Sequence, residues 1–145
     1  MKILSYGLLF VSQLFFGSSY AANERELEAP GPKSPLKGIH TTSDNADAPV
    51  ILIIPGSGPT DRNGNNPQGI KASTYKLLAE EFAAHEIQSV RVDKKGLFSS
   101  SAAVDNPNRV TIQDYVDDIN SWTQTIKSKT KLSCVWLLRH SEGGL

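Results

Sequence analysis

Five apolar residues, Val50-Ile51-Leu52-Ile53-Ile54, run directly into the turn Pro55-Gly56-Ser57-Gly58. A strand with no polar face is buried on both sides, and such strands are typical of parallel sheets covered by helices. The stretch therefore predicts a central strand of an α/β domain. The glycine-rich turn predicts an abrupt end to that strand.

A helix and a second strand are predicted after the polar loop that follows this turn. Ser73 or Thr74 can cap a helix that runs to about Glu86, although a glycine is expected where this glutamate stands. Residues 89–93 then predict a short strand, which ends in the turn 94–96.

The strongest predicted helix begins at Thr111. Asp114 stands three residues later in capping-box position, and an apolar stripe that includes Trp122 continues to Ile126. The apolar run 135–138 predicts the last strand. Strands and helices that alternate in this way give a parallel sheet with right-handed crossovers, so the predicted fold class is α/β.

The segments before the central strand are less regular. Residues 36–42 predict one short strand, whereas 22–35 is polar and contains three prolines, which predicts a flexible lead-in. We therefore expect the folded domain to cover residues 36–145.

The first 21 residues have the pattern of a secretory signal peptide. Lys2 supplies a positive start, an apolar stretch runs from Ile3 to Phe16, and small residues, Ser19 and Ala21, stand where a signal peptidase reads the chain. The apolar stretch is shorter than the roughly 20 residues that a spanning helix needs. We expect export to the periplasm or the medium, with cleavage near Ala21.

The composition excludes several classes of function. The 145 residues have a formal net charge of zero, which gives no field for attracting nucleic acid. One cysteine, Cys134, and three scattered histidines, His40, His85 and His140, provide neither a metal site nor an intramolecular disulfide. We expect no metal, no cofactor and no nucleic-acid partner.

Ser141 is the first candidate for chemistry, because it follows the last predicted strand. A serine on a sharp strand-to-helix turn is how one hydrolase fold exposes its nucleophile. Gly143 and Gly144 would let a following helix pass close to the strand, and the N–H of Glu142 would point toward a developing oxyanion. The same five residues also fit an ordinary turn, and alone they favour neither interpretation.

The turn after the central strand is the second candidate. The backbone N–H of Ser57 can be donated to the same oxyanion. Alternatively, Gly56 and Gly58 only permit unusual backbone angles. A phosphate-binding loop is less favoured, because the Lys-Ser/Thr ending of such loops is missing.

Four segments occur together in the order of a known family: 53–65, 91–96, 114–118 and 140–144. With them, residues 36–145 resemble the N-terminal half of a secreted alpha/beta-hydrolase of the serine aminopeptidase-like or acyl-hydrolase branch. The resemblance implies a partial alpha/beta-hydrolase fold, truncated after the strand that carries the nucleophile. It also implies Ser141 as the nucleophile, an oxyanion hole from the N–H groups of Ser57 and Glu142, and a small ester or peptide as substrate.

The chain departs from the family pattern around the serine. The motif has a glycine two residues before the serine, where this chain has Arg139, which predicts strain or a shifted serine. In the family, the triad acid and histidine follow the serine, and neither follows Ser141 here. We expect a truncated, inactive chain that a separately encoded C-terminal half would complete. The alternatives are a non-catalytic exported binding or scaffold remnant and an unstable gene-fragment product.

Several further residues carry expectations about packing. The strand 135–138 should keep one open, apolar edge, and Trp122 and Trp136 should be partly uncovered. Asp93 is expected to form a turn, and Asp118 is expected to be a solvated charge on a helix.

Overall fold

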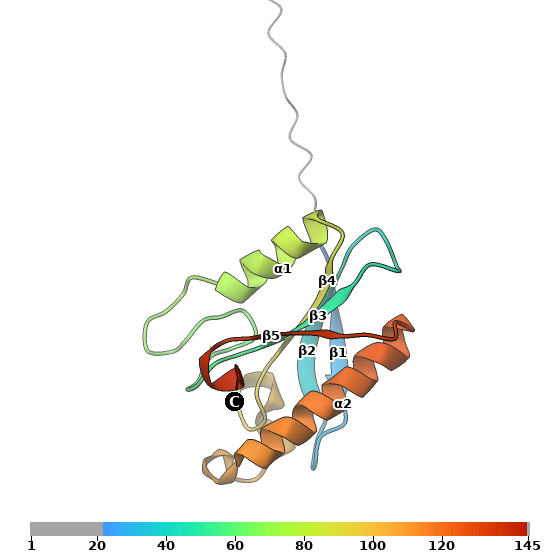
Figure 1. Ribbon diagram of the computed structural model, residues 1–145. Coiled ribbons are helices and arrows are strands. Elements are labelled where there is room, and N and C mark those ends of the chain that lie inside the picture. Colours follow the sequence, from blue (N-terminus) through green and yellow to red (C-terminus); the bar gives the residue numbers. More distant parts are fainter. Residues whose placement is uncertain (1–21, 145) are drawn as a thin grey trace, which may run out of the picture.

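Five strands form a single mixed sheet in the order β1-β2-β4-β3-β5 (Figure 1). The computed structural model describes residues 22–144, and the predicted signal peptide lies outside them. The strands are β1 (Asn23–Ala29), β2 (Leu36–Thr42), β3 (Val50–Ile54), β4 (Gln88–Val92) and β5 (Trp136–Arg139), and the helices are α1 (Thr74–Ala84) and α2 (Ile112–Thr130). Short 3-10 helices cover Phe98–Ala103, Pro107–Arg109 and Ser141–Gly144. The predicted α/β class is confirmed.

The sheet is parallel only in part. β3 lies between β4 and β5 and is parallel to both, as the sequence predicts. β2 runs antiparallel to β4, and β1 runs antiparallel to β2. The predicted parallel arrangement is confirmed for β3, β4 and β5, and the first two strands add an antiparallel part to the sheet. The short link between β1 and β2 suits a hairpin, whereas a parallel pair needs a longer crossover.

The predicted flexible lead-in is wrong for its first half. Residues 23–29 form β1, which pairs with β2 along its whole length. Only Leu27 and Ala29 of this strand are buried, while the first four residues are exposed. The prolines fall after the strand, where they do not interrupt the ladder.

The main core lies between the sheet and α2. Leu52, Ile54 and Val90 of the sheet pack there with the α2 residues Trp122 and Ile126. Trp122 was expected to be partly uncovered but is only 2% exposed. Its indole fits because a Cβ at Gly38 of β2 would lie 2.9 Å from the Trp122 Cη2 atom, so the glycine provides the room.

Helix α1 covers the opposite face of the sheet (Figure 1). Tyr75 and Ala79 are its buried residues. Beneath it lies Arg91 of β4, which is 1% exposed and donates a hydrogen bond of 2.6 Å to Asn63 Oδ1 and another to Glu24. A buried guanidinium needs such partners, because an unpaired buried charge is strongly destabilising.

The start of α2 and the end of α1 follow the sequence closely, whereas Ser73, at the N-cap of α1, forms no side-chain capping hydrogen bond. Thr111 and Asp114 form the predicted capping box at the start of α2. At the end of α1, the N–H of Ile87 bonds to Phe82 O at 2.9 Å and the N–H of Glu86 to Ala83 O at 3.1 Å, which is the pattern of a Schellman motif. Glu86 has a φ of 56°, so it occupies the position where a glycine is expected.

β5 lies at one edge of the sheet and pairs only with β3 within the described part of the chain. Trp136 is 62% exposed and Leu137 is 46% exposed, which confirms the predicted apolar edge. Within residues 22–144, no helix is long and apolar enough to cross a membrane.

Candidate active site

Ser141 lies in the turn that follows β5, and its backbone φ is 52°. Few residues other than glycine adopt this left-handed conformation, and those that do often lie at functional sites. The Ser141 side chain is exposed. A sharp turn that holds a serine in an unusual conformation at a strand end is the geometry by which a nucleophile is presented.

The turns after β3 and β5 are in contact. A Cβ at Gly143 would lie 2.9 Å from the Pro55 carbonyl oxygen, and a Cβ at Gly56 would lie 3.2 Å from Ser141 Cβ. Larger side chains at these two glycines would therefore separate the turns. The structure brings the two predicted segments together, which sequence separation alone does not ensure.

The other two turn glycines have different surroundings. Gly58 has a φ of 71°, which fits the expectation of an unusual backbone angle. Gly144 was expected to allow a close approach, but a Cβ there would meet nothing within 4 Å. Of Gly143 and Gly144, only Gly143 is therefore needed for the close approach between the two turns.

The oxyanion-hole residues remain predictions. Ser57 is exposed and directly follows Gly56, and Glu142 directly follows Ser141. Among the described residues, no acceptor is bonded to the N–H of Ser57. This amide, on the residue after Gly56, is therefore available to donate a hydrogen bond to a bound group.

Arg139 fits without entering the crowded turn. Its side chain is exposed, and its Nη1 donates a hydrogen bond of 3.3 Å to the carbonyl oxygen of Gly144. The backbone of Arg139 stays in register with Ile54 of β3. The long side chain therefore leaves the turn outward and bridges its two ends.

None of the three histidines is hydrogen-bonded to the Ser141 hydroxyl within residues 22–144. His40 lies in β2, inside the sheet rather than at its edge, and its Nε2 is 2.9 Å from Gln88 Oε1. Burial lowers the pKa of His40. His85 is exposed at the end of α1, and His140 Nδ1 is 3.0 Å from the hydroxyl of Tyr75.

Asp93 has a structural environment. Its carboxylate is 2% exposed and accepts hydrogen bonds of 2.8 Å from both the backbone N–H and the Nε of Arg62. It also accepts from the N–H of Ser99. These bonds join the loop after β3 to the loop after β4, which agrees with the expectation that Asp93 orders a turn.

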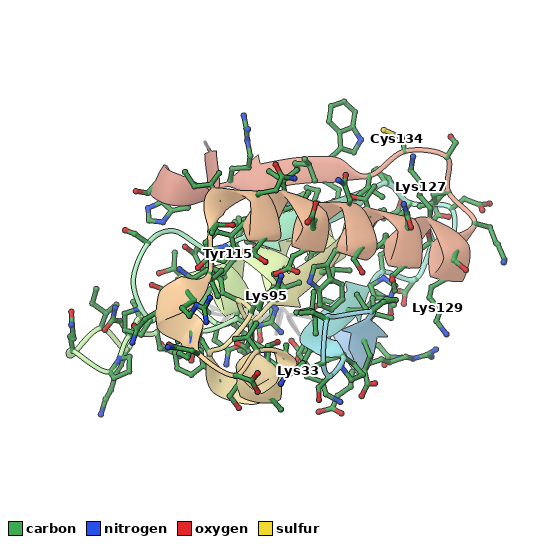
Figure 2. All side chains as sticks on the ribbon, turned by 90° about the horizontal axis from the view of Figure 1, so that it is seen from below. Lys33, Lys95, Tyr115, Lys127, Lys129 and Cys134 are labelled. Carbon is green, nitrogen blue, oxygen red and sulfur yellow. The ribbon has the colours of Figure 1, made fainter. Side chains whose placement is uncertain are left out.

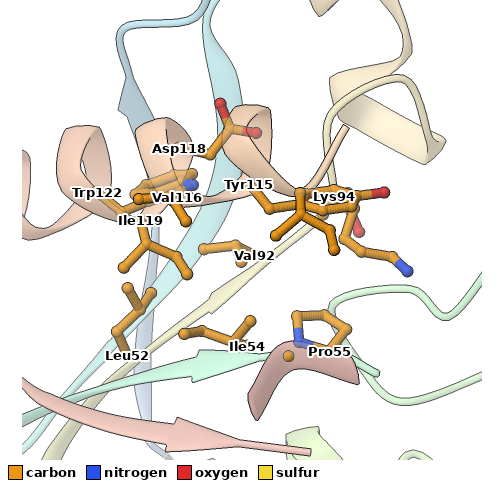
Figure 3. Close-up of a pocket in the computed structure, with 13 residues that line it drawn as sticks. Leu52, Ile54, Pro55, Val92, Lys94, Tyr115, Val116, Asp118, Ile119 and Trp122 are labelled. Atoms are coloured by element: carbon orange, nitrogen blue, oxygen red, sulfur yellow. The ribbon is translucent and has the colours of Figure 1, made fainter. Parts of the chain in front are cut away.

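Lys94 was not predicted to take part in the site. Its ammonium donates a hydrogen bond of 2.7 Å to the carbonyl oxygen of Gly56 and lies 5.9 Å from the centre of the Tyr115 ring. Figure 3 shows Lys94, Tyr115 and Pro55 at the same end of an apolar pocket. No sequence pattern predicts this contact, because it joins loops that follow different strands.

This pocket lies between α2 and the ends of β3 and β4, next to the Ser141 turn. Figure 3 shows Leu52, Ile54 and Val92 on the sheet side, facing Val116 and Ile119 of α2. Gly143 and Pro55 also line it. An apolar cavity beside a turn that exposes a serine suits the apolar part of a small substrate.

A largely buried ion pair connects the N-terminal half of α2 to the loop after β4. Lys95 Nζ lies 2.9 Å from Asp118 Oδ1, and the two side chains are 3% and 13% exposed. Figure 2 shows Lys95 beside α2. Burial raises the pKa of Asp118 to about 6. Burial lowers the pKa of Lys95, but the bonds to Asp118 and Asp114 outweigh this effect and raise it overall. The expectation that Asp118 is a solvated charge is wrong.

Comparisons with solved structures support the fold. The chain superposes on a cold-adapted esterase from an Arctic intertidal metagenomic library with a TM-score of 0.63 and 13% identity, covering 92% of this chain and 57% of that one. A serine hydrolase without a lid from Xanthomonas campestris gives 0.58 and 18%, covering 90% and 55%. Dienelactone hydrolase from Anabaena variabilis gives 0.63 and 16%, covering 86% and 55%.

These likenesses identify the fold. The chain has the fold of the alpha/beta-hydrolase superfamily in partial form, and it spans little more than half the length of the three hydrolases above. No protein-family model and no curated protein sequence matches it. The resemblance inferred from the sequence is confirmed at the level of fold.

Proposed function

We propose that this chain provides the nucleophile-bearing part of a serine hydrolase that cleaves ester or peptide bonds through an acyl-enzyme on Ser141. The observation that supports this most directly is the contact between the Gly56 turn and the Ser141 turn, with Ser141 held at a φ of 52°. Hydrolases of the same fold, including an esterase and an acylaminoacyl peptidase, provide the precedent.

The reaction assigns a role to each part of the site. Ser141 Oγ attacks the carbonyl carbon, and the N–H groups of Ser57 and Glu142 stabilise the oxyanion that forms. The serine proton passes to a base, the alcohol or amine leaves, and water then hydrolyses the acyl-enzyme. The apolar pocket beside Gly143 accommodates the apolar part of a small substrate.

We infer that the base and its orienting acid come from polypeptide beyond residues 22–144, because the histidines within them have hydrogen-bond partners other than the Ser141 hydroxyl. A longer form of this chain or a separate C-terminal half would serve. We therefore propose that residues 22–145 alone turn over substrate very slowly or not at all.

Active-site labelling tests the assignment. Residues 22–145 treated with a fluorophosphonate probe should be modified slowly at Ser141, and Ser141→Ala should remove this labelling. Ser101→Ala, at an exposed serine of a 3-10 helix, serves as the matched control and should label like the wild type. Modification that mass spectrometry maps to other serines would contradict the assignment.

Turnover assays test the expected inactivity. Residues 22–145 should hydrolyse p-nitrophenyl esters and aminoacyl amides no faster than Ser141→Ala. Turnover that Ser141→Ala abolishes would show that the chain contains its own base and acid.

A binding role is the second candidate, and the apolar edge of β5 favours it. Trp136 and Leu137 are exposed beside unpaired backbone groups, which is a surface that a further strand can cover. A partner that co-purifies and protects the β5 amides from hydrogen exchange would support this role. A stable, monodisperse monomer would show that no partner is needed.

Export remains part of the proposal. The supporting pattern is the sequence of residues 1–21, with cleavage near Ala21. Expression of the full chain with a C-terminal tag, followed by fractionation and N-terminal sequencing, should find a product that begins at Ala22 or Asn23. An uncleaved product in the cytoplasm would contradict it.

A further inference from the structure

Gly56 is held by side chains from two other parts of the fold. The Lys94 ammonium, from the loop after β4, donates to the Gly56 carbonyl oxygen at 2.7 Å. The ring of His140 lies against the glycine as well, since a Cβ at Gly56 would lie 2.8 Å from His140 Nδ1. The turn after β3 is thus held by two elements that approach it from different directions.

Tyr75 contacts the same histidine, which is the residue before the serine. Its hydroxyl lies 3.0 Å from His140 Nδ1, and the two rings meet edge to face with centres 6.2 Å apart. Tyr75 is only 8% exposed, so its ring is fixed by packing under the first turn of α1. This phenol therefore holds the His140 ring against the turn that carries Gly56.

The geometry of the peptide unit gives these contacts a chemical consequence. The Gly56 carbonyl and the Ser57 N–H belong to one planar, trans peptide, so they point in opposite directions. A donor that fixes the carbonyl on one side therefore fixes the direction of the N–H on the other. A Cβ at Gly56 would lie 3.2 Å from Ser141 Cβ, so this N–H belongs to the residue directly after the one that approaches the serine.

We propose that Lys94 and Tyr75 are positioning residues: Lys94 holds the peptide between Gly56 and Ser57 through its carbonyl, and Tyr75 holds His140 against Gly56, so that the Ser57 N–H is preset to receive the oxyanion formed at Ser141. The cation on the Gly56 oxygen also polarises the peptide, which makes the Ser57 N–H a stronger donor. This inference rests on the proposed function, because it assigns to two further residues a role in the same reaction.

The first arm of the test does not depend on activity. In residues 22–145 labelled with 15N, Lys94→Met should shift the Ser57 amide proton upfield, and Tyr75→Phe should change the Nδ1 resonance of His140 and speed exchange of the Gly56 amide. Lys94→Arg keeps a donor and should retain most of the wild-type Ser57 shift. Lys71→Met, at an exposed lysine, is the matched control and should change none of these signals.

The second arm measures the rate at which a fluorophosphonate modifies Ser141. Lys94→Met and Tyr75→Phe should each lower this rate roughly tenfold, which is less than the loss of an oxyanion donor itself. The thermal midpoint of each variant is measured alongside, so that unfolding is recognised; Lys94→Arg and Tyr75→Phe preserve the packing if Lys94→Met does not fold.

The two arms separate the possible failures. If wild type is not labelled but the amide signals change as expected, the proposed function fails and the positioning contacts stand. If labelling occurs but Ser57, Gly56 and His140 give wild-type signals and rates in folded Lys94→Met and Tyr75→Phe, the positioning role is overturned.

Discussion

At the residue scale, the site combines one strained backbone with several restrained side chains. Ser141 has a φ of 52°, a conformation that costs a residue with a Cβ on the order of 1 kcal/mol. The contacts of Gly56 and Gly143 hold the turns on either side of it together. The strain is therefore retained by packing, and it keeps the hydroxyl at the surface of the turn.

Asp118 makes stability depend on pH. Its pKa of about 6 in the folded chain lies above that of an unfolded aspartate, so the folded state binds the proton more tightly. This contribution to the free energy of unfolding is fully present below about pH 4 and is lost as pH rises through 6. Hydrogen bonds from Thr111 lower the pKa of Asp114 to about 2. Its contribution to the free energy of unfolding therefore has the opposite pH dependence and is lost as pH falls, at lower pH than that of Asp118.

We therefore expect the stability advantage of wild type over Asp118→Asn to shrink by roughly 1–2 kcal/mol between pH 4 and pH 7. Urea unfolding of both proteins at intervals of one pH unit measures this. Asp44→Asn, at an exposed aspartate, should show a difference that stays constant. A constant difference for Asp118→Asn as well would mean that its carboxyl titrates normally.

At the element scale, the helices follow local rules and the first strand does not. The capping box of Thr111 and Asp114 and the helix end at Glu86 each depend on residues close together in the sequence, so both could be predicted. β1 could not, because its side chains are mostly charged and only its pairing with β2 makes it a strand. Tertiary contact decides such segments.

Glu86 offers a direct gain in stability. It is the left-handed residue of a Schellman motif, and a glycine avoids the strain that its Cβ imposes there. Glu86→Gly should raise the free energy of unfolding by about 1 kcal/mol, whereas Glu81→Gly, inside α1, should lower it by a similar amount. Thermal and urea unfolding measure both. Destabilisation by Glu86→Gly would show that the glutamate makes contacts that outweigh the strain.

The parts of the site that sequence could reveal are also local. Ser141 and the Gly56 turn stand directly after apolar strands, and this pattern predicts them. Lys94, Tyr75 and Asp118 escape it because each acts through a residue 19 or more positions away: Lys94 through Gly56, Tyr75 through His140, and Asp118 through Lys95. No spacing rule connects such positions.

At the scale of the whole molecule, the two edge strands of the sheet differ in character. β1 covers the first edge with charged side chains, whereas β5 presents Trp136 and Leu137 at the other. Exposed apolar strand edges promote association. The asymmetry predicts that residues 22–145 associate through β5.

A charge on this edge should reduce the association. Leu137→Lys places a cation beside the unpaired backbone groups, a device that natural sheets use against edge pairing. Leu77→Lys changes an equally apolar residue, 59% exposed on α1, and serves as the control. Sedimentation velocity over a range of concentrations should show less oligomer for Leu137→Lys only. Equal association of wild type and both variants would place the contact elsewhere.

The strand order also determines when the sheet can form during synthesis. β2 takes its second neighbour from β4, which leaves the ribosome only after β3 and α1 have followed. Until then the hairpin of β1 and β2 stands alone, and an isolated hairpin is marginally stable in water. The first 90 or so residues of a nascent chain therefore form no structure that is stable against unfolding. If residues 1–21 direct export, the residues that follow them reach the translocation channel in a state unfolded enough to pass through it.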